Sequence, residues 1–141
     1  MNAPRKYANN FTGISISQGY GQINISKICW EVLGMPRIIT FVKFPEDPDW
    51  MYMFPRSVDY PNSTIGFVQF KDKVNRANTY IGTRDTVDDI CKMFKIYRKD
   101  PMVFSPFYIM REVMVDGEKI VRICMNHFEK YRNTGIIYAN R

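Results

Sequence analysis

Leucine is nearly absent from this chain, which has one leucine, Leu33, against 16 isoleucines. Helix-rich proteins generally use leucine heavily, whereas β-branched and aromatic side chains suit the pleated surface of a sheet. Aromatic residues make up 15% of the sequence and supply large buried areas. The composition therefore predicts a sheet-dominated α+β fold.

Residues that commonly carry chemistry are also scarce. The chain has one histidine, His127, and no Gly-x-Ser-x-Gly sequence that would place a nucleophilic serine on a strand-to-helix turn. Gly19-x-Gly21 lacks the third glycine of a dinucleotide-binding loop. No cysteine or histidine pair has zinc-ligand spacing. We therefore expect no enzymatic activity, no catalytic residues, no metal site and no cofactor.

Long hydrophobic runs are missing as well. No apolar segment approaches the roughly 20 residues that a membrane-spanning helix requires. The first ten residues lack the apolar core of a signal peptide. The odd number of cysteines, Cys29, Cys91 and Cys124, argues against a disulfide framework. These observations favour a cytoplasmic protein with buried free thiols.

Alternating apolar and polar residues predict antiparallel hairpins along most of the chain. The dipeptide Asp116-Gly117 suits a type I′ turn between two of the strands. The expected hairpins join 14–17 to 22–25, 37–44 to 50–54, and 107–115 to 119–125. Further strands are expected at 64–70 and in a segment that ends near Ile81.

Two short helices are expected, at about 26–33 and 87–96. Ser26 is placed as the N-cap of the first, and Gly34 suits the left-handed position just after its end. The second has the capping-box pattern Thr86-x-x-Asp89 and apolar residues at helical spacing from Val87 onwards.

The chain length of 141 residues suits a single domain. We expect a flexible basic arm at 1–10 and one compact domain at 11–141. An alternative is two lobes within that domain, a hairpin–helix–hairpin unit at 11–56 and a strands–helix–hairpin unit at 62–141.

A net charge of +6 favours a polyanionic partner through long-range attraction. Basic residues beside Phe67 and Phe70 would suit phosphate contacts next to stacked bases. They equally fit the solvated face of a hairpin whose aromatic residues point into the core. The candidates for nucleic-acid binding from this pattern and from the arm are Lys71, Lys73, Arg76, Arg5 and Lys6.

The segment ISISQGYGQINISKICWEVLGMPRIITF carries a further signal. Within residues 13–44 it resembles the swapped-hairpin, looped-hinge domain of AbrB- and MazE-type transition-state regulators and antitoxins. The residues that match the family pattern are Gly21, Gln22, Ile23, Ile25, Ser26, Leu33, Gly34, Ile39 and Phe41. The resemblance implies an intertwined homodimer that binds DNA, and by position it adds Lys27 and Arg37 to the candidate contacts.

These observations rank a small basic, non-enzymatic DNA-binding regulator first. A second hypothesis is a protein-interaction or inhibitor module from a mobile element such as a phage. Its candidate contact residues are Trp30, Trp50 and Tyr52, because aromatic residues are enriched at protein interfaces. The same side chains could instead pack beneath a hairpin. A third hypothesis is a protein that binds or sequesters a small ligand.

Overall fold

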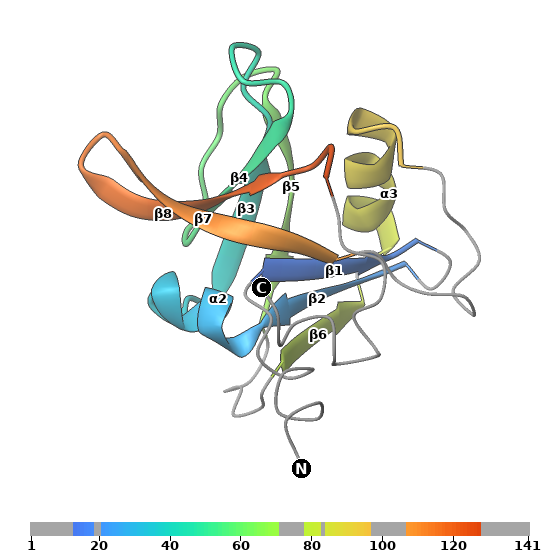
Figure 1. The fold of residues 1–141 in the computed structure, drawn as a ribbon, viewed down its shortest axis with the longest axis horizontal. Helices are drawn as coiled ribbons and strands as arrows, with labels where there is room; N and C mark the ends of the chain where they lie inside the picture. The colour runs from blue at the N-terminus through green and yellow to red at the C-terminus, as the bar shows by residue number, and fades with distance from the viewer. Residues whose placement is uncertain (1–12, 19–20, 71–77, 83, 97–106, 128–141) are drawn as a thin grey trace.

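The structure is a computed structural model that describes residues 13–18, 21–70, 78–82, 84–96 and 107–127. In these ranges eight strands form one curled antiparallel sheet in the order β5-β3-β4-β8-β7-β1-β2-β6 (Figure 1). The elements are β1 (Gly13–Ser17), β2 (Gln22–Ser26), α2 (Lys27–Val32), β3 (Ile38–Val42), β4 (Trp50–Phe54), β5 (Thr64–Gln69), β6 (Asn78–Gly82), α3 (Arg84–Met93), β7 (Phe107–Val115) and β8 (Glu118–Cys124). The predicted fold class, a sheet-dominated α+β protein with two short helices, is confirmed.

All three predicted hairpins are present. β1 pairs with β2, β3 with β4, and β7 with β8. Asp116 and Gly117 both have positive φ, at 52° and 83°, as a type I′ turn requires. The strands expected at 64–70 and before Ile81 correspond to β5 and β6, which lie at the two edges of the sheet.

The first helix forms where the sequence predicts it. The side chain of Ser26 accepts a hydrogen bond from the backbone N–H of Cys29, which caps α2. At the other end Gly34 has a φ of 87°, and its N–H donates to the carbonyl of Glu31. The N–H of Met35 reaches back to the carbonyl of Trp30, which completes a Schellman motif.

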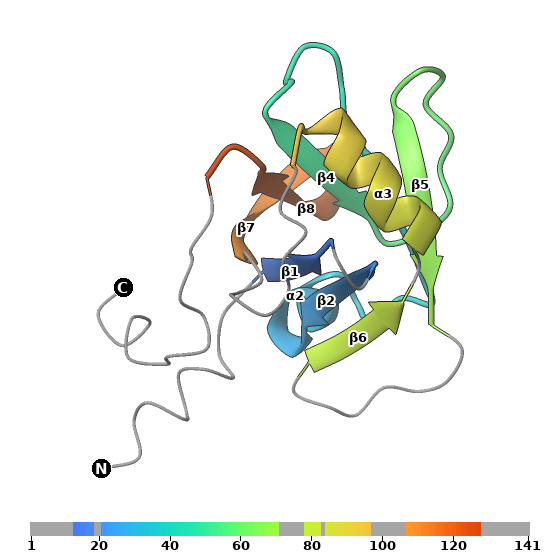
Figure 2. The same ribbon diagram turned by 90° about the vertical axis from the view of Figure 1, so that its right-hand side faces the viewer.

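The second helix is shifted towards the N-terminus from its predicted range of about 87–96, since it begins at Arg84 and ends at Met93, before Lys95 adopts a left-handed φ of 58°. Its first residues, Arg84 and Asp85, are polar and exposed. A prediction based on the helical spacing of apolar residues therefore does not include the first turn. Thr86 is therefore not an N-cap. Its hydroxyl instead donates to the carbonyl of Phe67 at 3.0 Å and ties α3 to edge strand β5. Figure 2 shows α3 lying over this side of the sheet.

The two chain segments considered as alternative lobes share the sheet. β8 pairs with β4 and β7 pairs with β1, so the β7–β8 hairpin lies between strands from the first half of the chain. Likewise β5 pairs with β3, and β6 pairs with β2. The predicted flexible arm at 1–10 lies outside the described residues.

Hydrophobic side chains gather on both faces of the sheet. The larger cluster packs under both helices and includes Ile14, Ile25, Trp30, Phe41 and Ile90. A smaller cluster occupies the opposite face of β3, β4, β7 and β8 and is built on Val42, Tyr52, Phe54 and Ile120. The ring of Phe44 packs edge-on against Tyr52 and Tyr60 there, at centroid distances of 5.0 Å in both cases. The second face is therefore partly covered by the loops that follow β3 and β4.

Strands β1 and β7 approach each other closely at Gly13. Gly13 is opposite Ile109, and a Cβ added to Gly13 would overlap the carbonyl oxygen of Tyr108. Because that neighbour is backbone, it cannot move aside without disturbing the sheet. A glycine is therefore required at this position for the two strands to pair.

Ser26 provides a direct test of this local architecture. Its buried hydroxyl oxygen accepts from the N–H groups of Gly13 and Cys29, both at 3.1 Å. Replacing Ser26 by alanine removes the cap and leaves the second buried donor unpaired, so we expect Ser26→Ala to lower the free energy of unfolding by about 2–3 kcal/mol. Urea unfolding followed by circular dichroism would measure it. The exposed Ser57→Ala variant is the control and should match the wild type, and equal stability of both variants would contradict the assigned role of Ser26.

Candidate functional site

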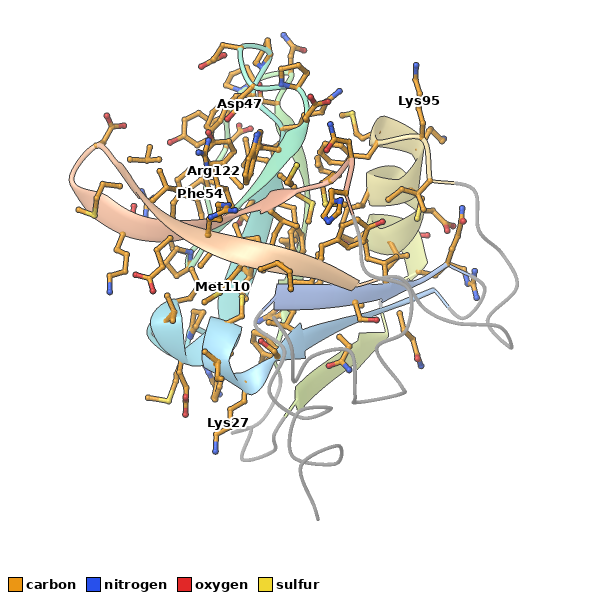
Figure 3. All side chains as sticks on the ribbon, in the orientation of Figure 1. Lys27, Asp47, Phe54, Lys95, Met110 and Arg122 are labelled. Atoms are coloured by element: carbon orange, nitrogen blue, oxygen red, sulfur yellow. The ribbon has the colours of Figure 1, made fainter. Side chains whose placement is uncertain are left out.

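Two of the seven predicted nucleic-acid contacts lie in the described ranges. Lys27 is the first residue of α2, and Arg37 is exposed just before β3. In Figure 3, Lys27 projects outward from one end of the molecule and Lys95 from the opposite end. The other five candidates lie outside the described residues: Arg5, Lys6, Lys71, Lys73 and Arg76.

Two of the three aromatic residues proposed for protein contact are packed inside the fold. Trp30 and Tyr52 are each only 8% exposed. The indole N–H of Trp30 donates to the carbonyl of Pro36 at 3.1 Å, and its ring packs against Phe70. The expectation that Trp30 and Tyr52 offer a protein-binding surface is therefore corrected, because both side chains are buried in the hydrophobic clusters of the fold. Trp50 is half-buried and remains accessible.

A polar cluster crosses the second face of the sheet. We call it the arginine–aromatic face and define it as Asp47, Trp50, Tyr52, Arg111 and Arg122. Tyr52 on β4 is directly opposite Arg122 on β8, which is directly opposite Arg111 on β7. Residues directly opposite in antiparallel strands point to the same face of the sheet. The three strands thus place these side chains in one row, with Asp47 supplied by the loop before β4.

Arg122 is held by several contacts at once. Its Nη1 lies 3.1 Å from Asp47 Oδ2 and 3.4 Å from the hydroxyl oxygen of Tyr52. Its guanidinium carbon lies 4.1 Å from the centre of the Trp50 ring, within the range of a cation–π interaction. The hydroxyl of Tyr52 also donates to Asp47, so Asp47, Tyr52 and Arg122 are joined by three hydrogen bonds. Asp47 and Arg122 are labelled in Figure 3. The guanidinium group of Arg122 is therefore fixed in position.

Arg111 differs from Arg122 in its surroundings. It is exposed and has no ion-pair partner among the described residues. Like charges directly opposite each other in a sheet are destabilising, so the pair breaks a local rule of strand pairing. The five residues carry two positive charges and one negative charge, and the loop that supplies Asp47 also carries the exposed carboxylates of Glu46 and Asp49.

Burial is the main cause that raises the pKa of Tyr52 above its ordinary value of 10.0, and the hydrogen bond to Asp47 adds to it. The nearby Arg122 acts in the opposite direction but does not cancel the effect. The Tyr52 hydroxyl therefore remains a protonated donor at neutral pH. Because its single O–H group already donates to Asp47, the donors left for an anion are guanidinium N–H groups of the two arginines, beside the aromatic surface of Trp50.

Sequence reasoning missed Asp47, Arg111 and Arg122, although a signal for the two arginines was available. A two-residue turn at Asp116-Gly117 pairs Val115 with Glu118. Counting four residues outward along each strand then pairs Arg111 with Arg122. The link from Arg122 to Asp47 depends on the pairing of β8 with β4, which no local pattern indicates.

Charge is distributed unevenly between the described ranges and the rest of the chain. Of 20 basic and 14 acidic residues, the described ranges hold 10 basic and 11 acidic ones, which leaves 10 basic and three acidic residues for the remaining segments. The net positive charge of the chain therefore comes from residues 1–12, 71–77, 97–106 and 128–141. The described part is close to electrically neutral.

Among the described residues, no three His, Cys, Asp or Glu side chains gather in a way that could hold a metal ion. None of the helices in these ranges has the length and apolar character needed to cross a bilayer. Comparisons with protein-family models, with curated proteins and with solved structures found no match.

The pKa of Tyr52 predicts a specific pH dependence of stability. Because folding raises this pKa, its contribution is fully present below the unfolded pKa of about 10 and is lost as pH rises towards the folded value. We expect the free energy of unfolding of the wild type to fall more steeply above about pH 10 than that of Tyr52→Phe. Urea unfolding of both proteins at a series of pH values would test this, since the other tyrosines and lysines are common to both. Parallel curves would contradict it.

Proposed function

We propose that the protein is a non-enzymatic DNA-binding regulator whose main DNA contacts come from the basic segments of the chain. The observation that carries the proposal is the uneven charge distribution. Ten basic and three acidic residues fall in the segments outside the described ranges, while the described part is nearly neutral. Five of the seven predicted contacts belong to those segments: Arg5, Lys6, Lys71, Lys73 and Arg76.

This charge distribution suits a phosphate backbone for a physical reason. Lysine and arginine gathered in a few segments raise the local positive potential, which attracts a polyanion over long distances. Binding then releases the counterions condensed on the DNA, which supplies much of the affinity. A chain that needed basic residues only for solubility could spread them evenly over its surface.

The exposed hydrophobic residues give less support to a protein partner. Large apolar side chains that are exposed in the described part lie on four elements and one loop, and Ile109 and Met114 lie on opposite faces of β7. The set is Ile28, Met35, Phe67, Met93, Ile109 and Met114. Apolar residues scattered singly are ordinary on a protein surface, whereas an interface needs a contiguous patch. We therefore place DNA ahead of a protein partner.

The proposal includes a homodimer, which rests on the resemblance of residues 13–44 to AbrB- and MazE-type domains. Light scattering coupled to size exclusion should then give twice the chain mass of 16.7 kDa. A mass of one chain at every concentration tested would remove the dimer from the proposal. It would leave DNA binding to be judged by its own experiment.

DNA binding should weaken steeply as salt is added. Each phosphate contact contributes about 0.9 to the slope of log affinity against log salt concentration for duplex DNA. We expect Lys71→Gln/Lys73→Gln to reduce that slope by up to about 1.8 in a fluorescence anisotropy titration. The matched control is Lys92→Gln/Lys119→Gln, which removes two exposed charges from α3 and β8 and should leave the slope unchanged. Failure of the wild type to bind DNA even at low salt would refute the proposed function.

A further inference from the structure

The arginine–aromatic face has two arginines directly opposite each other on the neighbouring strands β7 and β8. Side chains directly opposite in an antiparallel pair have their Cβ atoms about 5 Å apart. Arg111 and Arg122 are such a pair. Guanidinium groups carried by such a pair repel each other when they approach, and an anion between them would attract both.

The two arginines have complementary roles in such a site. Asp47 and Trp50 fix the position of Arg122, and the hydrogen bonds to Asp47 and Tyr52 use only its Nη1 atom. The side chain of Arg122 remains 31% exposed. Arg111 is exposed and has no ion-pair partner in the described ranges, so no ion pair within those ranges has to break when it contacts a ligand.

Phosphate is the anion that best fits this pair. The planar guanidinium group presents hydrogen-bond donors in a fork that matches phosphate oxygens, and two such groups can approach one phosphate from two sides. Asp47 neutralises one of the two positive charges, so the face retains one charge for a ligand of the opposite sign. Trp50 lies against Arg122 and provides an aromatic surface beside the anion position.

We infer that the arginine–aromatic face binds a single-stranded stretch of DNA, with one phosphate held between Arg111 and Arg122 and a neighbouring base packed beside Trp50. This inference rests on the proposed function and adds a second contact surface on the sheet itself. The strand must be single because a base becomes available to an aromatic side chain only when it is unpaired and unstacked.

Arg111 is the residue to change, because the described structure gives it no hydrogen bond or ion pair whose removal would disturb the fold. Arg111→Gln and Arg111→Glu should bind a single-stranded oligonucleotide more weakly than the wild type, by up to about fivefold for the neutral variant at low salt. The salt slope should fall by about 0.7, because the substitution removes one phosphate contact with a single strand. Circular dichroism and thermal unfolding should show that both variants fold as the wild type does.

A matched control lies on the same hairpin. Lys119 on β8 is opposite Met114 rather than in the row of Arg111 and Arg122, and its amino group lies 3.5 Å from Glu112. Lys119→Gln and Lys119→Glu make the same charge changes on the other face of the sheet. They should retain wild-type affinity and salt slope for the single strand.

Tryptophan fluorescence tests the base contact separately. Bound single-stranded DNA should quench the emission of Trp50, and the quenching should disappear in Trp50→Phe, which keeps Trp30 in the core. A duplex of the same sequence should produce little quenching. Equal quenching by duplex and single strand, or quenching that persists in Trp50→Phe, would overturn the assignment of a base to Trp50.

The outcomes separate this inference from the proposed function. If the wild type binds no DNA, the proposed function fails and this inference fails with it. If the wild type binds DNA but the Arg111 and Lys119 variants behave alike, only the phosphate site is overturned. If a glutamate-rich peptide binds in an Arg111-dependent way while the oligonucleotide does not, the face belongs to an acidic protein segment and the inference is wrong.

Discussion

The rest of the structure depends on the hydrogen bonding of the β7–β8 hairpin to strands on both of its sides. β8 pairs with β4, and β7 pairs with β1. Without these two ladders, the strands β5-β3-β4 and β1-β2-β6 would form two separate three-stranded sheets. With them, Ile123 on β8 and Tyr108 on β7 join the same core as residues from the first half of the chain. The β7–β8 hairpin therefore joins two groups of three strands into one sheet.

The close approach of β1 and β7 limits the sequence at this junction. Gly13 has no side chain, and this permits the backbone of Tyr108 to lie against it. One strand further along, Ser26 accepts the N–H of Gly13 while it also caps α2. The beginning of β1, the end of β2 and the start of the helix are thus held at one point. Gly13 leaves room for the backbone of Tyr108, and the hydroxyl of Ser26 accepts both backbone N–H groups.

Local features of the fold could be predicted from the sequence because neighbouring residues determine them. The Asp116-Gly117 turn, the cap at Ser26 and the left-handed Gly34 each depend on a few consecutive residues. The start of α3 could not be predicted, since its first turn is polar and is held in place by the contact between Thr86 and distant Phe67. The order of strands in the sheet is likewise set by packing between segments far apart in the sequence, which leaves no periodic signal.

The candidate site was less accessible to sequence reasoning than the fold. Trp30 and Trp50 both belong to stretches rich in apolar residues, yet Trp30 on α2 is buried in the larger core cluster and Trp50 on β4 lies beside Arg122. Their different roles follow from the side of the sheet on which each one packs, Trp30 in the larger cluster and Trp50 against the smaller one. The contact between Asp47 and Arg122 joins residues 75 positions apart and forms only because β4 and β8 are neighbours. Such sites depend on strand order, and composition records only the residue types.

The order of the strands also has a consequence for folding during synthesis on the ribosome. β4 and β1 are made early, but their missing neighbours, β8 and β7, come from residues 107–124. Until that region emerges, both strands present open hydrogen-bonding edges to other nascent chains, and such edges promote aggregation. The newly made chain is therefore prone to aggregation until the β7–β8 hairpin inserts between β4 and β1.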